Sequence, residues 1–112
     1  MKTLKTNWTN NEFKAYILLY AANADYIVTD TEKDIILELV DQKQYHTIYA
    51  ELNYDNDYTS IQKIQYNIEK FNYSENDIKK LLSEIKELFL SDGKFDYLEK
   101  YMLKSLERIF KA

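Results

Sequence analysis

The chain has no cysteine and no proline, and its only glycine is Gly93. The absence of cysteine excludes a disulfide framework, a thiolate metal site and a cysteine nucleophile. It also suits a reducing compartment. Proline and glycine both interrupt helices, so their scarcity favours helices over a sheet connected by tight turns.

Long apolar runs and a basic stripe are also missing. The longest apolar stretch, 15–24, is about half as long as a membrane-spanning helix requires. Residues 1–9 show no secretory signal, so we expect a cytoplasmic protein without direct membrane insertion. Fifteen basic and nineteen acidic residues give a net charge of −4. Because nucleic-acid binding depends on clustered positive charge, we expect no nucleic-acid partner.

What is present is a series of amphipathic helices in a chain of one-domain length. The 112 residues, 46% of them hydrophobic, are sufficient to bury a core. We expect a polar N-terminal segment over 1–9 and a single helical domain over 10–112. The predicted fold class is all-α, a single helical bundle of about six helices with a duplicated helix-turn-helix unit.

Helix start signals place these helices along the chain. Capping boxes at Thr9–Glu12 and Thr29–Glu32 predict a first helix over 10–24 and a second helix with an apolar face between Ile35 and Val40. The first helix is apolar nearly all round, which is typical of a buried central helix.

The middle and the end of the chain carry weaker signals. A short third helix is expected around 45–52, followed by a loop over 53–57, where Asn and Asp side chains can bond their own backbone. A fourth helix carries apolar residues between Ile61 and Phe71. Ser74 and Asp96 mark the starts of the last two helices.

Two turns of the chain resemble each other. The first spans 24–33 and the second spans 91–100. Each has an Asp seven positions before a Glu: Asp25 and Glu32 in the first, Asp92 and Glu99 in the second. An apolar residue and a helix-capping residue lie between them at equivalent positions. This repetition indicates a pseudo-symmetric bundle with the two middle helices inserted between the repeats.

The four turn carboxylates are candidate metal ligands. Their spacing matches the latter half of a helix-loop-helix calcium loop, but the earlier ligand positions are missing in both copies, which excludes a standard EF-hand. If the turns adjoin, Asp25, Glu32, Asp92 and Glu99 would offer oxygen-only ligation suited to calcium, magnesium or manganese. A second interpretation remains open, in which these acids only cap helices and satisfy turn amides.

The alanine-rich end of the first helix, 21–25, and the segment Ser91–Glu99 resemble the TerB-like (tellurite-resistance) family. The resemblance implies a small, all-helical, intracellular protein that is linked to tellurite or other chemical stress. It also implies that acidic residues bind a divalent metal, a role that falls on the same four carboxylates. Tyr26 departs from the family pattern, because the family favours glycine at that position.

No catalytic constellation is visible in the sequence. His46 is the only histidine, one glycine cannot form a phosphate-binding loop, and the serines lie in no nucleophile context. We therefore expect a non-enzymatic stress-associated module that binds a divalent cation, a protein partner or a second copy of itself. Two alternatives remain: a helical protein-interaction scaffold, and a small hydrolase with a carboxylate-bound metal.

Overall fold

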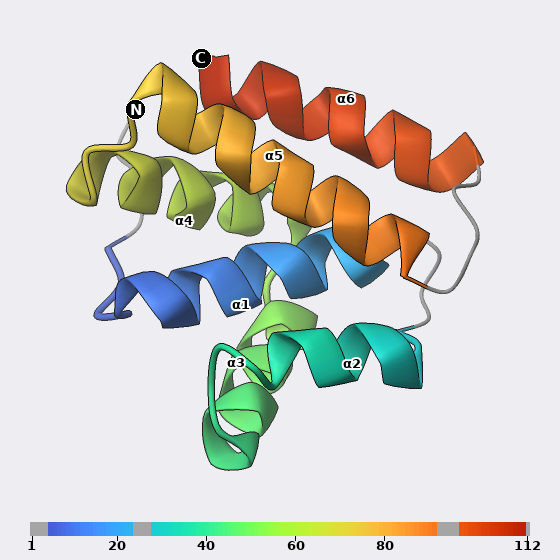
Figure 1. Cartoon of the computed structure of the whole chain (residues 1–112). Coiled ribbons are helices and arrows are strands. Elements are labelled where there is room, and N and C mark those ends of the chain that lie inside the picture. The colour runs from blue at the N-terminus through green and yellow to red at the C-terminus, as the bar shows by residue number, and fades with distance from the viewer. Residues whose placement is uncertain (1–4, 24–27, 92–96, 112) are drawn as a thin grey trace.

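The computed structural model describes residues 5–23, 28–91 and 97–111, and these residues form six α-helices and no strand. The helices, labelled in Figure 1, are α1 (Asn10–Ala22), α2 (Asp30–Ile36), α3 (Gln42–Tyr54), α4 (Asp57–Lys70), α5 (Glu75–Leu90) and α6 (Tyr97–Lys111). The predicted all-α bundle of six helices is confirmed. In the described ranges, no helix is long and apolar enough to cross a membrane.

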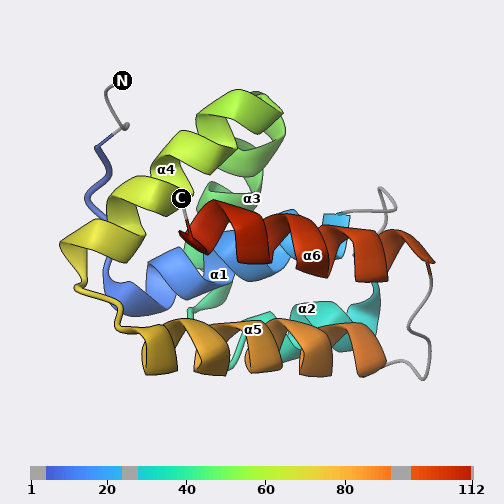
Figure 2. The same cartoon turned by 90° about the horizontal axis from the view of Figure 1, so that it is seen from above.

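The helix α1 lies at the centre of the bundle and packs against every other helix. Figure 2 shows α2 and α5 on one side of it and α3 and α4 on the other. Its buried residues point in nearly all directions: Phe13, Ala15, Tyr16, Ile17, Leu18, Leu19, Ala21 and Ala22. Each large apolar side chain buried in this way contributes about 1.5–3 kcal/mol to stability. The absence of a polar stripe on α1 therefore reflects its position.

Reciprocal side-chain caps begin four of the helices whose N-caps the structure describes. In the predicted box on α1, the Thr9 hydroxyl accepts a bond from the Glu12 amide at 3.2 Å, and the Glu12 carboxylate accepts one from the Thr9 amide at 3.0 Å. The predicted starts at Thr29 on α2 and Ser74 on α5 have the same arrangement. A further box at Asp41 begins α3, and the sequence analysis did not identify it.

Two helices end earlier than predicted. The last residue of α1 is Ala22, with Asn23 as its C-cap. The helix α2 ends at Ile36, because the Leu39 amide bonds to the Ile36 carbonyl at 2.9 Å and tightens the last turn. Val40 is nevertheless buried. The chain turns at this point, and α3 begins directly afterwards.

The predicted loop over 53–57 is wrong, and so is the short third helix. The helix α3 has 13 residues and continues to Tyr54, while α4 begins at Asp57. Only Asp55 and Asn56 connect the two helices. Asn56 caps α4 by accepting a bond from the Thr59 amide at 2.8 Å. The polar residues that predicted a flexible loop instead form a two-residue corner between helices.

The described part of the N-terminal segment packs against the bundle. The Trp8 ring is only 9% exposed, and its centroid lies 4.4 Å from that of the Tyr16 ring. The Thr6 hydroxyl donates to Asn67 Oδ1 at 3.1 Å and accepts from Asn67 Nδ2 at 2.9 Å. The Lys70 ammonium on α4 also donates to the Thr6 carbonyl at 3.3 Å and to the Trp8 carbonyl at 3.5 Å, so side chains of both α1 and α4 hold this polar segment.

We predict that truncating Leu106 to Ala in α6 lowers the free energy of unfolding by about 2–5 kcal/mol, because the side chain is fully buried and the substitution leaves a cavity. Urea denaturation measures this change. Leu90→Ala is the matched control, since Leu90 is 47% exposed and should lose well under half as much. Equal losses for the two variants would show that α6 does not pack on the core as described.

Candidate functional site

Of the four predicted ligands, Glu32 is the one whose side chain the structure describes. It lies in the first turn of α2 and is only 3% exposed. Its Oε1 accepts bonds from the Thr29 amide at 3.0 Å and from the Thr29 hydroxyl at 3.2 Å. The capping role expected for Glu32 is therefore present, and it fixes the direction of a buried carboxylate at the start of α2.

The remaining three ligands lie wholly or partly outside the described residues. Asp25 and Asp92 fall in the two connections that the structure does not describe. Glu99 is the third residue of α6, so its backbone is helical, but its side chain is not described. The position of Glu99 in α6 is equivalent to that of Glu32 in α2, as the repeated turn predicts.

The helix ends that flank the two turns lie at the same end of the molecule. In Figures 1 and 2, the last turns of α1 and α5 and the first turns of α2 and α6 all lie on the right. Both helix pairs are therefore antiparallel hairpins with the same orientation. Contacts of α1 with α5 and α6, and of α2 with α5, hold the two hairpins together.

A second polar centre joins α1, α3 and α4, and the sequence analysis missed it. The Asp55 carboxylate has only 3% of its side chain exposed. It accepts a bond from the Tyr16 hydroxyl at 2.7 Å and one from the Lys63 ammonium at 2.7 Å. Lys63 also bonds Glu51 at 2.8 Å. Because the Tyr16 hydroxyl donates its hydrogen to Asp55, the Ser60 hydroxyl, 2.8 Å away, donates to the Tyr16 oxygen.

Burial and these hydrogen bonds shift the pKa values of Tyr16 and Lys63. Burial raises the pKa of Tyr16 well above its usual value, the hydrogen bond from Ser60 opposes this shift, and Asp55 adds to it. Burial disfavours the charge on Lys63, but the hydrogen bonds to Asp55 and Glu51 outweigh it and raise the pKa of the ammonium. At neutral pH the centre thus holds a protonated phenol and a charged lysine, an arrangement that links three helices.

Side chains at the corner between α3 and α4 point both into the domain and out to solvent. Asp55 turns inward, whereas Tyr54 is 91% exposed and Tyr58 is 58% exposed. The Tyr20 hydroxyl donates to Asp57 at 2.5 Å. The pKa of Tyr20 is raised mainly by its burial and further by this hydrogen bond. A cavity of about 320 Å³ lies beside this corner, lined by Tyr20, Asn23, Leu52, Asp55, Asp57, Ser60 and Met102.

Among the residues whose side chains are described, no three acidic or histidine groups are close enough to share a metal ion. His46, the only histidine in the sequence, is exposed on α3. Comparisons with protein-family models, with curated proteins and with solved structures found no match.

We predict that Tyr16→Phe lowers the free energy of unfolding by about 1–3 kcal/mol, because it removes a donor from the buried Asp55 carboxylate. Chemical denaturation measures the loss. Tyr54→Phe makes the same chemical change at an exposed ring and should stay within about 0.5 kcal/mol of wild type. Similar effects for both variants would contradict a structural role for the Tyr16 hydroxyl.

A second prediction concerns alkaline pH. The folded chain retains the protons of Tyr16 and Tyr20 above the usual tyrosine pKa of about 10, whereas the unfolded chain loses them there. The unfolded state then binds fewer protons, so the stabilisation from these two hydroxyls is constant below about pH 9.5 and is lost as pH rises further. Each proton contributes a slope of about 1.4 kcal/mol per pH unit. Urea midpoints that stay level from pH 9 to 11 would contradict the burial of these hydroxyls.

Proposed function

We propose that the chain is a non-enzymatic, TerB-like, stress-associated module that binds one divalent cation between its two helical hairpins. The ligands in this proposal are Asp25, Glu32, Asp92 and Glu99. The observation that supports it is the common position of the four helix ends that flank the two turns (Figures 1 and 2). A link to tellurite or related chemical stress follows from the resemblance of the turns to the TerB-like family.

Calcium, magnesium or manganese suits this set of ligands, because all the offered atoms are carboxylate oxygens. The buried Glu32 carboxylate accepts bonds from the Thr29 amide and hydroxyl, which offset lost hydration and hold it at the start of α2. Four carboxylates at one end of a bundle would also repel each other. A bound cation would relieve this repulsion, so binding should stabilise the folded chain.

One observation favours an alternative, a helical protein-interaction scaffold whose turn acids act only as caps. Glu32 already has the reciprocal bonds of a capping box. In this alternative the partner is another protein or a second copy of the chain, and exposed side chains such as Tyr54 and Tyr101 are available to contact it. The two functions differ in whether the folded chain responds to a cation.

Thermal melts with calcium, magnesium or manganese separate the two functions. A cation present at ten times its dissociation constant should add about 1.4 kcal/mol to the stability. For a chain of this size, that corresponds to a rise in Tm of about 5 °C. Asp92→Asn should abolish the rise, because it removes one ligand.

The control for charge is Asp41→Asn. Asp41 caps α3, away from the two turns, and Asn retains the capping oxygen. Both variants change the net charge by the same amount, so a general effect of ionic screening would appear in both. The scaffold function is favoured if none of the three cations changes the Tm at millimolar concentration, or if Asp92→Asn responds as wild type does.

A further inference from the structure

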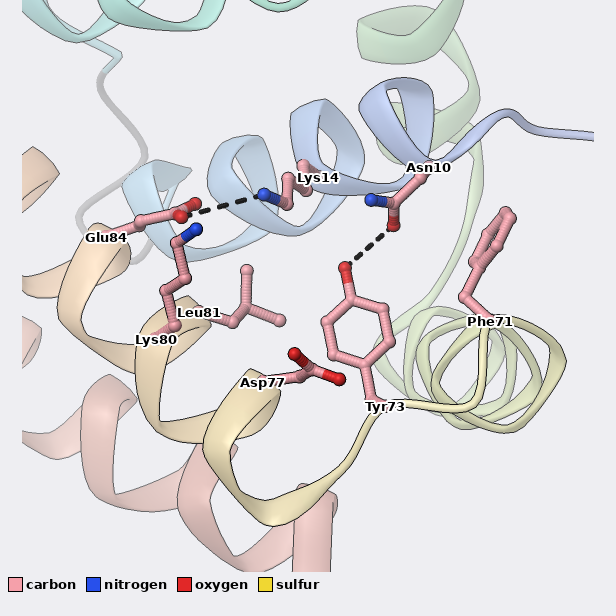
Figure 3. Close-up of a pocket in the computed structure, with 8 residues that line it drawn as sticks. All are labelled: Asn10, Lys14, Phe71, Tyr73, Asp77, Lys80, Leu81 and Glu84. Carbon is pink, nitrogen blue, oxygen red and sulfur yellow. Dashed lines mark hydrogen bonds and ion pairs between the residues drawn. The ribbon is translucent and has the colours of Figure 1, made fainter.

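A pocket of about 340 Å³ lies at the end of α1 opposite the two turns. Residues of α1, of the α4–α5 connection and of α5 line it, as Figure 3 shows: Asn10, Lys14, Phe71, Tyr73, Asp77, Lys80, Leu81 and Glu84. A volume of this size is within the range that binds small molecules.

Most of the polar groups around the pocket are held in place by other groups. Lys14 on α1 pairs with Glu84 on α5 at 3.6 Å. The Tyr73 hydroxyl donates to Asn10 Oδ1 at 2.8 Å. The Asp77 carboxylate accepts a bond from the Ser74 amide at 3.0 Å, and this contact lowers the pKa of Asp77, so the group is ionised. A ligand would therefore meet preorganised groups and lose little affinity to ordering them.

Lys80 is the exception. Within the described part of the chain its ammonium has no ion pair or hydrogen bond. Figure 3 shows it extending toward the same end of the pocket as the Lys14 and Glu84 side chains. Since Glu84 balances Lys14, that end retains one positive charge. Asp77 lies on the other side of Leu81 and provides one negative charge.

The wall between these two charges is apolar. Leu81 is 1% exposed and lies beneath the floor of the pocket, whereas the half-buried Tyr73 ring forms its surface. The Tyr73 ring stands edge-on to Phe13 with 5.8 Å between the centroids, so its position is fixed by the core. Phe71 forms the neighbouring part of the wall. The pocket thus combines one excess positive charge, one negative charge and an apolar surface between α1 and α5.

We propose that this pocket binds a free α-amino acid with an apolar side chain. Its carboxylate would face Lys80, its ammonium would face Asp77, and its side chain would pack on the half-buried rings of Tyr73 and Phe71. A phosphate or dicarboxylate would be repelled by Asp77 and Glu84, and a diamine by the two lysines. A wholly apolar ligand would bury charges without compensating them.

Titration of the whole chain with L-leucine, followed by the NMR shifts of its backbone amides, tests the proposal. We expect saturable shifts at the starts of α1 and α5, with a dissociation constant below about 1 mM. N-acetyl-L-leucine lacks the ammonium and L-leucinamide lacks the carboxylate. Each should bind about tenfold more weakly, because each loses one charged contact.

Substitutions assign the two ends of the ligand. Lys80→Gln should weaken L-leucine binding about tenfold and leave L-leucinamide binding unchanged. Asp77→Asn, which retains the cap of α5, should weaken L-leucine binding and leave N-acetyl-L-leucine binding unchanged. Lys79→Gln is the matched control: it removes the same charge from the next residue of α5, which lines a different groove with Glu75 and Leu82.

Three results would overturn the proposal. The first is the absence of saturable shifts with L-leucine up to about 10 mM, a concentration that detects even weak specific binding. The second is equal binding of L-leucine and N-acetyl-L-leucine, which would indicate a site for carboxylates in general. The third is an equal loss of affinity in Lys79→Gln and Lys80→Gln, which would indicate a general effect of charge.

Discussion

The burial of α1 on all its sides is the constraint on which the rest of the structure depends. A helix without a solvent-facing stripe is stable in water only if other elements cover its whole circumference. In this chain α2 and α5 cover one side and α3 and α4 the other, and α6 packs on α1, α4 and α5. The order of helices around α1 then determines which loops and side chains become neighbours.

Complete burial also places a polar group inside the bundle. The Tyr16 hydroxyl would lose its hydrogen bonds to water, a loss that is unfavourable unless protein groups replace them. Ser60 and Asp55 replace them, and Lys63 balances the charge of Asp55. The helix α4 also buries polar residues, Ser60, Gln62 and Asn67, and of these Ser60 contacts the Tyr16 hydroxyl. The Asp55 carboxylate inside the domain thus serves both the tyrosine of the central helix and the lysine of α4.

The two ends of α1 have different chemistry. At its C-terminal end, the two hairpins bring four helix ends together, and the acids proposed as cation ligands belong to the turns that connect them. At its N-terminal end, Lys14 and Asn10 face α5 across a pocket whose charges balance. The first arrangement suits a bare cation, and the second suits a small molecule that carries both charges. Because α1 separates them, either site can be tested without altering the other.

The sequence alone determined the helical class, the number of helices and most of their starts. These properties depend on short-range physics: the absence of proline, apolar residues three and four positions apart, and caps such as Thr9 with Glu12 that form within one turn. It also indicated the repeated turn and the buried α1. The sequence-based prediction was wrong at the α3–α4 corner, where it placed Asp55 in a flexible loop. Only the tertiary structure decided that Asp55 turns inward, because its partners Tyr16 and Lys63 come from other helices. The amino-acid pocket depends in the same way on distant residues, since Lys14 and Glu84 lie 70 positions apart and meet only when α5 packs on α1.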